Sequence, residues 1–130
     1  YPIVDLEKVG VGLREYIDAL EQSVIDCLKL WGIEAGRIAG ASGVWIEPEG
    51  ARARKICAIG VRSSRYVTMH GFAFNVSTDL RFFSYINPCG FVDKGVTSME
   101  AELGRKVDIE QVKAELLNQL KEKLDVKIYK

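Results

Sequence analysis

Three side chains that can take part in group transfer fall within residues 55–89: Lys55, His70 and Cys89. Cys89 lies in the sequence Asn-Pro-Cys-Gly, and the flanking proline and glycine predict a tight, exposed turn. The thiolate is the reactive form of cysteine, and a turn gives a substrate access to it. The residues around Cys89 therefore favour a cysteine nucleophile.

Two side chains compete for the role of partner to this thiol. The ammonium group of Lys55 would lower the pKa of a nearby thiol by Coulomb attraction, and the apolar residues that follow Lys55 would partly dehydrate it. His70 is the rival, because Cys–His is the commoner arrangement for a cysteine nucleophile. The ordinary alternatives are a solvent-exposed lysine and a histidine hydrogen-bonded within a sheet. The residues alone leave both partners open.

An antiparallel hairpin is expected to carry Lys55 and His70. Residues 55–62 predict one strand, residues 63–65 a turn, and residues 66–76 a return strand that is interrupted at His70-Gly71. Glycine within a strand often marks a bulge or the close approach of a ligand. Small residues on both strands leave room beside the backbone: Ala58, Gly60, Gly71 and Ala73.

The rest of the chain predicts an α+β fold with a mostly antiparallel sheet. Helical spacing of apolar residues predicts helices at residues 11–31 and 108–123, and Cys27 is expected in the core beside the first apolar stripe. The other expected elements are a strand at 1–6, a loop followed by a strand within 37–47, a turn at 48–54 with two solvated arginines, a short helix or turn at 79–86 and a short helix that follows Ser98 and ends at Gly104.

Composition narrows the class of protein. The 130 residues suffice for one domain, and 18 basic residues balance 18 acidic ones, which gives no argument for nucleic-acid binding. The three cysteines are widely spaced and predict neither a zinc site nor a disulfide framework, so a reducing cytosol is the simplest compartment. No apolar run reaches the roughly 18 residues of a membrane span.

Several segments together resemble the octanoyltransferases, the lipoyl(octanoyl) transferases of lipoate synthesis. The matching segments are Gly43-Val44-Trp45-Ile46, Lys55-Ile56-Cys57-Ala58-Ile59-Gly60-Val61-Arg62, Thr68-Met69-His70-Gly71-Phe72-Ala73-Phe74-Asn75-Val76, Asp79-Leu80, Ile86-Asn87-Pro88-Cys89-Gly90 and Val96-Thr97-Ser98-Met99. The resemblance covers nearly the whole chain. It implies a biotin protein ligase and lipoate ligase-like fold, with an antiparallel sheet and flanking helices.

The resemblance also implies a mechanism and a site. Cys89 would take an octanoyl group from octanoyl-acyl carrier protein, and a lysine amine on a lipoyl domain would receive it, with Lys55 as the partner of Cys89. The acceptors would be the lipoyl domains of 2-oxoacid dehydrogenase complexes and the H protein of glycine cleavage. No cofactor or metal is implied, and the expected location is cytoplasmic. The residues that would line the acyl site are Ala58, Ile59, Gly60, His70, Gly71, Phe72 and Ala73.

This sequence lacks two segments of the family pattern, and their absence raises alternatives to a complete transferase. In the family, an Arg-Gly-Gly and a Tyr-His-Gly-Pro-Gly-Gln segment precede the strand that residues 1–6 resemble, and neither is in this sequence. We therefore expect a single catalytic domain over residues 1–130, N-terminally truncated. One alternative is a truncated, non-catalytic module that binds a lipoyl domain. The other is an ATP-dependent lipoate-protein ligase, against which the Pro-Cys-Gly turn argues.

Overall fold

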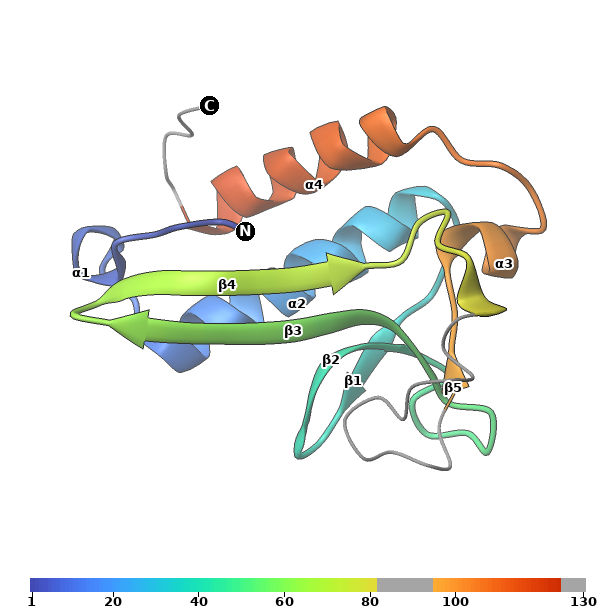
Figure 1. The fold of residues 1–130 in the computed structure, drawn as a ribbon, viewed down its shortest axis with the longest axis horizontal. Helices are drawn as coiled ribbons and strands as arrows, with labels where there is room; N and C mark the ends of the chain where they lie inside the picture. Colours follow the sequence, from blue (N-terminus) through green and yellow to red (C-terminus); the bar gives the residue numbers. More distant parts are fainter. Residues whose placement is uncertain (82–94, 125–130) are drawn as a thin grey trace.

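The computed structural model of the chain describes residues 1–81 and 95–124. Within them a five-stranded sheet has the order β1-β2-β3-β4, and β5 also pairs with β3 (Figure 1). All pairs are antiparallel except β3 with β5. The mostly antiparallel sheet confirms the α+β prediction. The strands are β1 (Gly36–Ile38), β2 (Ala41–Ile46), β3 (Arg54–Ser64), β4 (Val67–Phe74) and β5 (Gly95–Val96).

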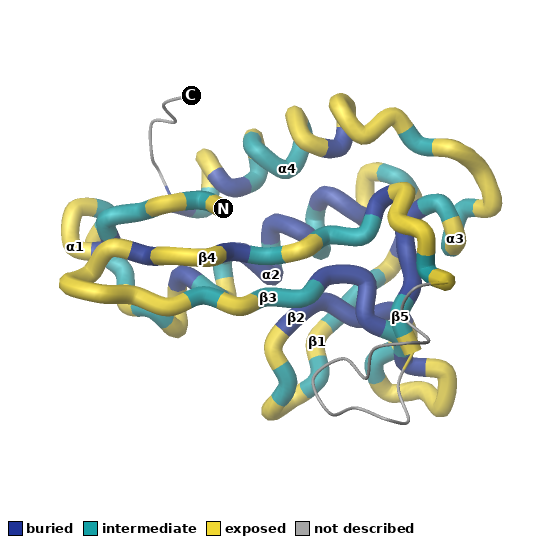
Figure 2. The backbone as a smooth tube through the Cα atoms, viewed as in Figure 1, coloured by how far each residue is buried: buried dark blue, intermediate teal, exposed yellow. Residues whose placement is uncertain are grey.

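The helices are α1 (Leu6–Val9), α2 (Leu13–Leu30), α3 (Met99–Leu103) and α4 (Ile109–Leu124). Helix α2 packs on one face of the sheet and α4 packs against α2 (Figure 1). The core lies between them, and Figure 2 shows its buried residues concentrated on α2, on β2 and at the start of β3. Its members include Val24, Cys27, Leu28, Val44, Ile46, Ile56 and Val112.

Both long helices were predicted from their apolar spacing. Helix α2 begins after Gly12 and ends before Gly32, whose φ of 79° suits the left-handed position that often stops a helix. Cys27 is fully buried, which confirms the expected core position. The short helix α3 begins at the expected N-cap, where the Ser98 side chain accepts a hydrogen bond from the Ala101 N–H.

The β3–β4 hairpin pairs without a break from Cys57↔Phe74 to Ser64↔Val67. The turn consists of Arg65 and Tyr66, with φ of 50° and 68°, which is the pattern of a type I′ hairpin turn. The prediction placed the turn slightly early, because the two serines before it belong to β3. It also placed an interruption at His70-Gly71, but the ladder continues through both residues.

The strand predicted at residues 1–6 is wrong for most of its length. Only Asp5 pairs, in an isolated bridge with Val67, and α1 begins at the next residue. The Asp5 carboxylate accepts hydrogen bonds from the Glu7 and Lys8 N–H groups, and this capping starts a helix where extended chain was expected. Within residues 37–47, the predicted order of a loop and then a strand is correct for the strand, but the first two residues belong to β1 and not to a loop. Most of the helix or turn predicted at 79–86 lies outside the described residues.

Candidate active site

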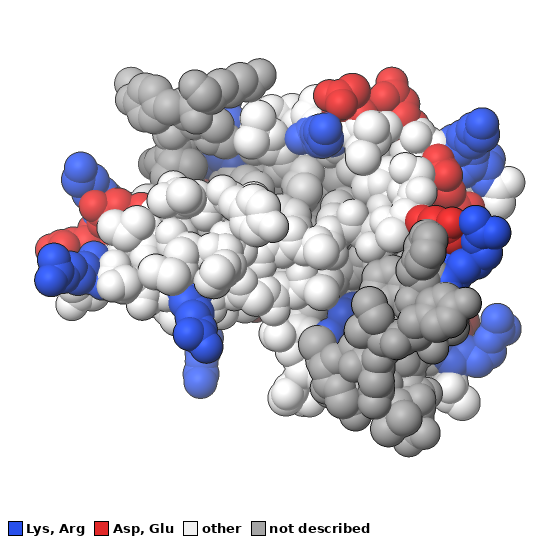
Figure 3. Space-filling model, viewed as in Figure 1, with Lys and Arg blue, Asp and Glu red and all other residues white. Residues whose placement is uncertain are grey.

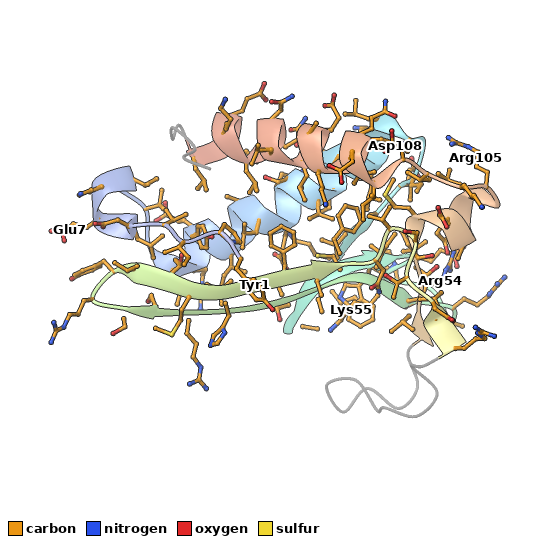
Figure 4. All side chains as sticks on the ribbon, turned by 45° about the horizontal axis from the view of Figure 1, so that its top comes forward. Tyr1, Glu7, Arg54, Lys55, Arg105 and Asp108 are labelled. Carbon is orange, nitrogen blue, oxygen red and sulfur yellow. The ribbon has the colours of Figure 1, made fainter. Side chains whose placement is uncertain are left out.

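Lys55 is buried at the start of β3. It retains 9% of its accessible surface, and its Nζ lies 4.9 Å from the centroid of the Trp45 ring on β2. A cation at this distance from an indole face is attracted by the ring, more strongly when both are shielded from water. Figure 4 shows Lys55 where β2 and β3 run side by side. The ordinary expectation of a solvent-exposed lysine is therefore wrong here.

A β-bulge determines which face of the sheet Lys55 occupies. The pairing of β2 with β3 passes from Val44↔Cys57 to Trp45↔Lys55, so Ile56 is an extra residue on β3. Side chains alternate between the two faces of a regular strand, and without the bulge Lys55 would share the core face with Cys57. Instead Ile56 and Cys57 both belong to the core beneath α2, and Lys55 lies beside Trp45 on the other face.

Gly43 provides the surface against which the stem of Lys55 lies. Its φ is 115°, and a Cβ at this position would be 2.6 Å from the Cys57 carbonyl oxygen and 3.4 Å from the Cε of Lys55. A side chain would therefore collide with the backbone of β3. On the other side, the Gly43 N–H donates a 2.9 Å hydrogen bond to Oε2 of the buried Glu21.

The face that carries Lys55 continues along the hairpin as a strip of small residues. Two cross-strand pairs form it, Ala58↔Ala73 and Gly60↔Gly71. A Cβ on Gly60 would meet nothing within 4 Å, whereas one on Gly71 would lie 3.2 Å from the Tyr1 Cα. The surface of the sheet therefore has free space above Gly60, whereas the N-terminal residues cover it at Gly71.

The predicted acyl-site residues divide between the two faces. Ile59 and Phe72 alternate with the small residues and pack against the core clusters on the opposite face. His70 is exposed and pairs with Val61, six positions along β3 from Lys55, or roughly 20 Å at the rise of a strand. The structure therefore brings the small residues onto the Lys55 face but does not bring His70 near Lys55.

His70 has an unusual backbone. Its φ is 64°, although it lies within a continuous ladder. Residues other than glycine pay for this left-handed conformation, and such strain often occurs at functional sites. The irregularity expected at His70-Gly71 is thus present as strain at His70 and not as a break in pairing.

An ion-pair network fastens the neighbouring elements to the start of β3. Arg54 donates from Nε to Glu102 on α3 at 2.8 Å, and the Thr97 hydroxyl donates to the same carboxylate at 2.6 Å. The Thr97 N–H donates to the Lys55 carbonyl at 2.9 Å. Hydrogen bonds from Arg54 hold the pKa of Glu102 below its usual value. The expectation that both arginines of the preceding turn are solvated is wrong for Arg54, and no local sequence signal indicated its partner.

Cys89 lies outside the described residues. The chain re-enters the described structure at Gly95, which pairs with Arg54 beside Lys55. The two described cysteines are poor nucleophiles, because burial raises the pKa of Cys57 to about 12 and that of Cys27 to about 11. Neither thiol would be ionised to a useful extent at neutral pH.

On the face of the molecule that Figure 3 shows, Lys, Arg, Asp and Glu gather mainly toward the two ends. Residues of other types make up most of the surface between them, over β3 and β4. Among residues 1–81 and 95–124, no group of three His, Cys, Asp or Glu side chains could hold a metal ion. Within the same ranges, no helix has the length and apolar character needed to cross a bilayer.

Known proteins resemble this chain in sequence and in fold. A profile of the family described as Lipoyl protein ligase A/B catalytic domain matches residues 1–121. The octanoyltransferase of Bacteroides fragilis (strain YCH46) is 60% identical over 120 residues, which are 92% of this chain and 54% of that protein. That of Flavobacterium johnsoniae is 50% identical over 121 residues, 92% of this chain and 52% of the relative. The chain spans about half the length of these relatives.

Solved structures show the same fold. Biotin protein ligase from Aquifex aeolicus superimposes with a TM-score of 0.70 at 17% identity, over 95% of this chain and 50% of the ligase. The same ligase in complex with biotin and ATP also gives a TM-score of 0.70, at 18% identity, over 95% of this chain and 47% of that one. The predicted biotin protein ligase-like fold is thereby confirmed.

Proposed function

The chain belongs to the lipoyl protein ligase A/B catalytic domain family, and we propose that it is the catalytic part of an octanoyltransferase that uses Cys89 as nucleophile and Lys55 as its partner. The octanoyl donor is acyl carrier protein. The acceptor is a lysine amine on a lipoyl domain, such as those of 2-oxoacid dehydrogenase complexes or the H protein of glycine cleavage. The reaction takes place in the cytoplasm.

The transfer has two steps. The Cys89 thiolate attacks the carbonyl carbon of the carrier thioester, a new thioester forms, and the carrier sulfur leaves as a thiol with a proton donated by the Lys55 ammonium. The acceptor amine then attacks this thioester, the amide bond forms, the Cys89 thiolate is released, and the proton lost by the amine returns to Lys55. Splitting one acyl transfer into two steps through a covalent intermediate is the advantage of a nucleophilic cysteine.

The buried ammonium of Lys55 is the observation that carries the proposal. A cation that is shielded from water and held on the face of Trp45 attracts an anion more strongly than a solvated lysine does. It would favour the thiolate over the thiol and so lower the pKa of Cys89. Gly95 pairs next to Lys55, and residues 89–95 span at most about 20 Å when extended, so the covalent connection permits the contact.

The strip of small residues supports an acyl chain as the substrate. Ala58, Gly60 and Ala73 lie on the Lys55 face of the hairpin, where little side-chain volume stands between the backbone and a ligand. The scarcity of charge over β3 and β4 suits an apolar chain (Figure 3). Ile59 and Phe72 would support this surface from the core side.

The test is to incubate the folded chain with octanoyl-acyl carrier protein and measure its intact mass. We expect a gain of one octanoyl group, which Cys89→Ser abolishes. Absence of an adduct on the folded protein would contradict the transferase and favour a non-catalytic binding module. Transfer from free octanoate only when ATP is added would favour a ligase, the activity of the structural neighbour that binds biotin and ATP.

The partner of the thiol is tested by the rate of Cys89 alkylation against pH. Lys55→Met should raise the apparent pKa of the thiol, because the positive charge is lost and the side-chain volume is kept. His70→Ala is the matched control and should leave this pKa unchanged. The opposite pattern would assign the role to His70.

A further inference from the structure

We infer that Glu21 is a positioning residue for Lys55 and acts through Gly43. Glu21 lies on α2, on the core side of the sheet, while the Lys55 side chain lies on the other side. Gly43 connects them, because its N–H donates to the carboxylate and the lysine stem lies next to the space that a Cβ on Gly43 would occupy. Glu21 would position Lys55 whether or not the chain transfers an octanoyl group. Only the benefit of this position for catalysis rests on the proposed function.

Glu21 is a buried carboxylate whose two oxygens have separate partners. Oε2 accepts the 2.9 Å hydrogen bond from the Gly43 N–H, and Oε1 accepts one of 3.2 Å from the Nε of Arg37. Glu21 retains 8% of its accessible surface, and a carboxylate so far from water is costly unless it is paired. Arg37 supplies the counter-charge, which leaves Oε2 to hold β2.

The bond to Glu21 holds Gly43 in an uncommon conformation. A φ of 115° is uncommon for any side-chain-bearing residue, and the glycine is pressed so close to β3 that a Cβ would be 2.6 Å from the Cys57 carbonyl oxygen. A charge-assisted hydrogen bond from a backbone N–H to a carboxylate is about twice as strong as a neutral one. Glu21 therefore anchors β2 at a point where the backbone of β3 leaves no room for a side chain.

The stem of Lys55 follows the surface that Gly43 leaves bare. The position of the missing Cβ is 3.4 Å from Cε and 3.6 Å from Cδ of the lysine, and the ammonium lies over the ring of Trp45, two residues further along β2. A shift of Gly43 would therefore move the aliphatic stem and, with it, the ammonium relative to the indole ring. Sites of this kind need their groups held to within about 0.5 Å.

Two substitutions can distinguish the charge of Glu21, which faces Arg37, from its hydrogen bond to Gly43. Arg37 also binds Gln22 and Asp18, so it remains anchored to α2 when Glu21 changes. Glu21→Gln removes the charge but keeps an oxygen that can accept from Gly43. Glu21→Leu removes the acceptor as well, at similar volume. If Glu21 acts through the Gly43 hydrogen bond, the glutamine variant should behave much more like the wild type than the leucine variant does.

The test is a two-dimensional proton–carbon NMR spectrum of the chain, with the Cε–Hε signal of Lys55 assigned by its loss in Lys55→Met. In the wild type, the Trp45 ring current should displace this signal upfield from those of the other lysines. Glu21→Leu should remove most of the displacement, and Glu21→Gln should retain most of it. Ser23→Ala is the control, because Ser23 is also buried on α2 but its hydroxyl bonds only to the Ala19 carbonyl among the described contacts.

An unchanged Lys55 signal in folded Glu21→Leu would overturn the inference, as would an equal loss of the displacement in Ser23→Ala. If Glu21→Leu does not fold, the same two measurements are made on Glu21→Gln: the Lys55 Cε–Hε signal and the rate of Cys89 alkylation against pH. Glu21→Gln has one oxygen for the two donors Gly43 N–H and Arg37 Nε–H, so its result is read together with the temperature coefficient of the Gly43 amide proton. A folded glutamine variant whose Gly43 N–H is still hydrogen-bonded but whose Lys55 signal has lost the displacement would equally refute the role of the hydrogen bond. The signal does not depend on octanoyl transfer, so a normal result in a chain that forms no octanoyl adduct would refute only the proposed function.

Discussion

Breaking the pair between Arg54 and Glu102 should destabilise the fold measurably. The two side chains retain 22% and 17% of their accessible surface, so water screens the pair only in part. Arg54→Met would leave the Glu102 carboxylate with the hydrogen bond from the Thr97 hydroxyl. Hydrogen bonds to charged groups contribute about 1.5–3 kcal/mol, and we expect a loss of about 2 kcal/mol. With an unfolding entropy of about 2.1 cal/mol/K per residue, this lowers Tm by roughly 7 °C for 130 residues.

The assay is thermal and urea unfolding of the wild type, Arg54→Met, Glu102→Gln and the double variant. We expect a coupling energy of about 1 kcal/mol or more between the two sites. The exposed pair of Lys113 with Glu110 is the matched control and should show little coupling, because its side chains are 64% and 77% exposed. Coupling at Arg54 and Glu102 no larger than in the control would refute the argument from burial.

The pair of Arg54 with Glu102 also predicts how the stability of the fold depends on pH. Arg54 lowers the pKa of Glu102 in the folded state below the ordinary value of 4.5, so the unfolded chain holds the proton more tightly. The stabilisation is therefore present above about pH 4.5 and is lost as the pH falls through the folded pKa. The stability gap between wild type and Glu102→Gln should narrow from pH 6 to pH 3, and a gap that widens would contradict this sign.

Three further predictions follow from individual residues. His70→Gly should stabilise the chain by up to about 1 kcal/mol in urea unfolding, because glycine adopts a φ of 64° without strain; a loss of stability would mean that the side-chain contacts of His70 outweigh it. Gly43→Ala should cost more than about 2 kcal/mol in the same assay, since its Cβ would lie 2.6 Å from a carbonyl oxygen; a wild-type midpoint would contradict that packing. Cys27 and Cys57, with pKa values raised to about 11 and 12, should resist iodoacetamide at pH 8 until the chain unfolds, as peptide mapping can show.

The sequence was informative where a pattern is long and local. Helices α2 and α4 extend over several turns, so their apolar spacing identified them to within a few residues. The hairpin was predicted from its apolar runs and its turn. Strands β1 and β5, of three and two residues, are too short for any period to appear. They exist because neighbouring strands offer them hydrogen bonds, which is a tertiary effect.

The sequence singled out Lys55 as a candidate residue, but it did not predict the side chains that surround it. Alternation along β3 would place its side chain in the core, and only the extra residue at Ile56, visible in the pairing with β2, reverses this. The partnership of Arg54 with Glu102 joins residues 48 positions apart, and that of Glu21 with Gly43 joins a helix to a strand. Such contacts depend on the packed fold, so no local signal could have revealed them.

The bulge at Ile56 divides β3 into two segments with opposite phase. The segment before it takes its orientation from β2 and presents Lys55, whereas the segment after it takes its orientation from β4 and presents the small residues. Because one inserted residue sets the offset, deleting Ile56 would invert Lys55 and the preceding Arg54 relative to the strip, and it would also remove one core side chain. The placement of Lys55 is therefore encoded by the length of the strand at this point as much as by the residues within it.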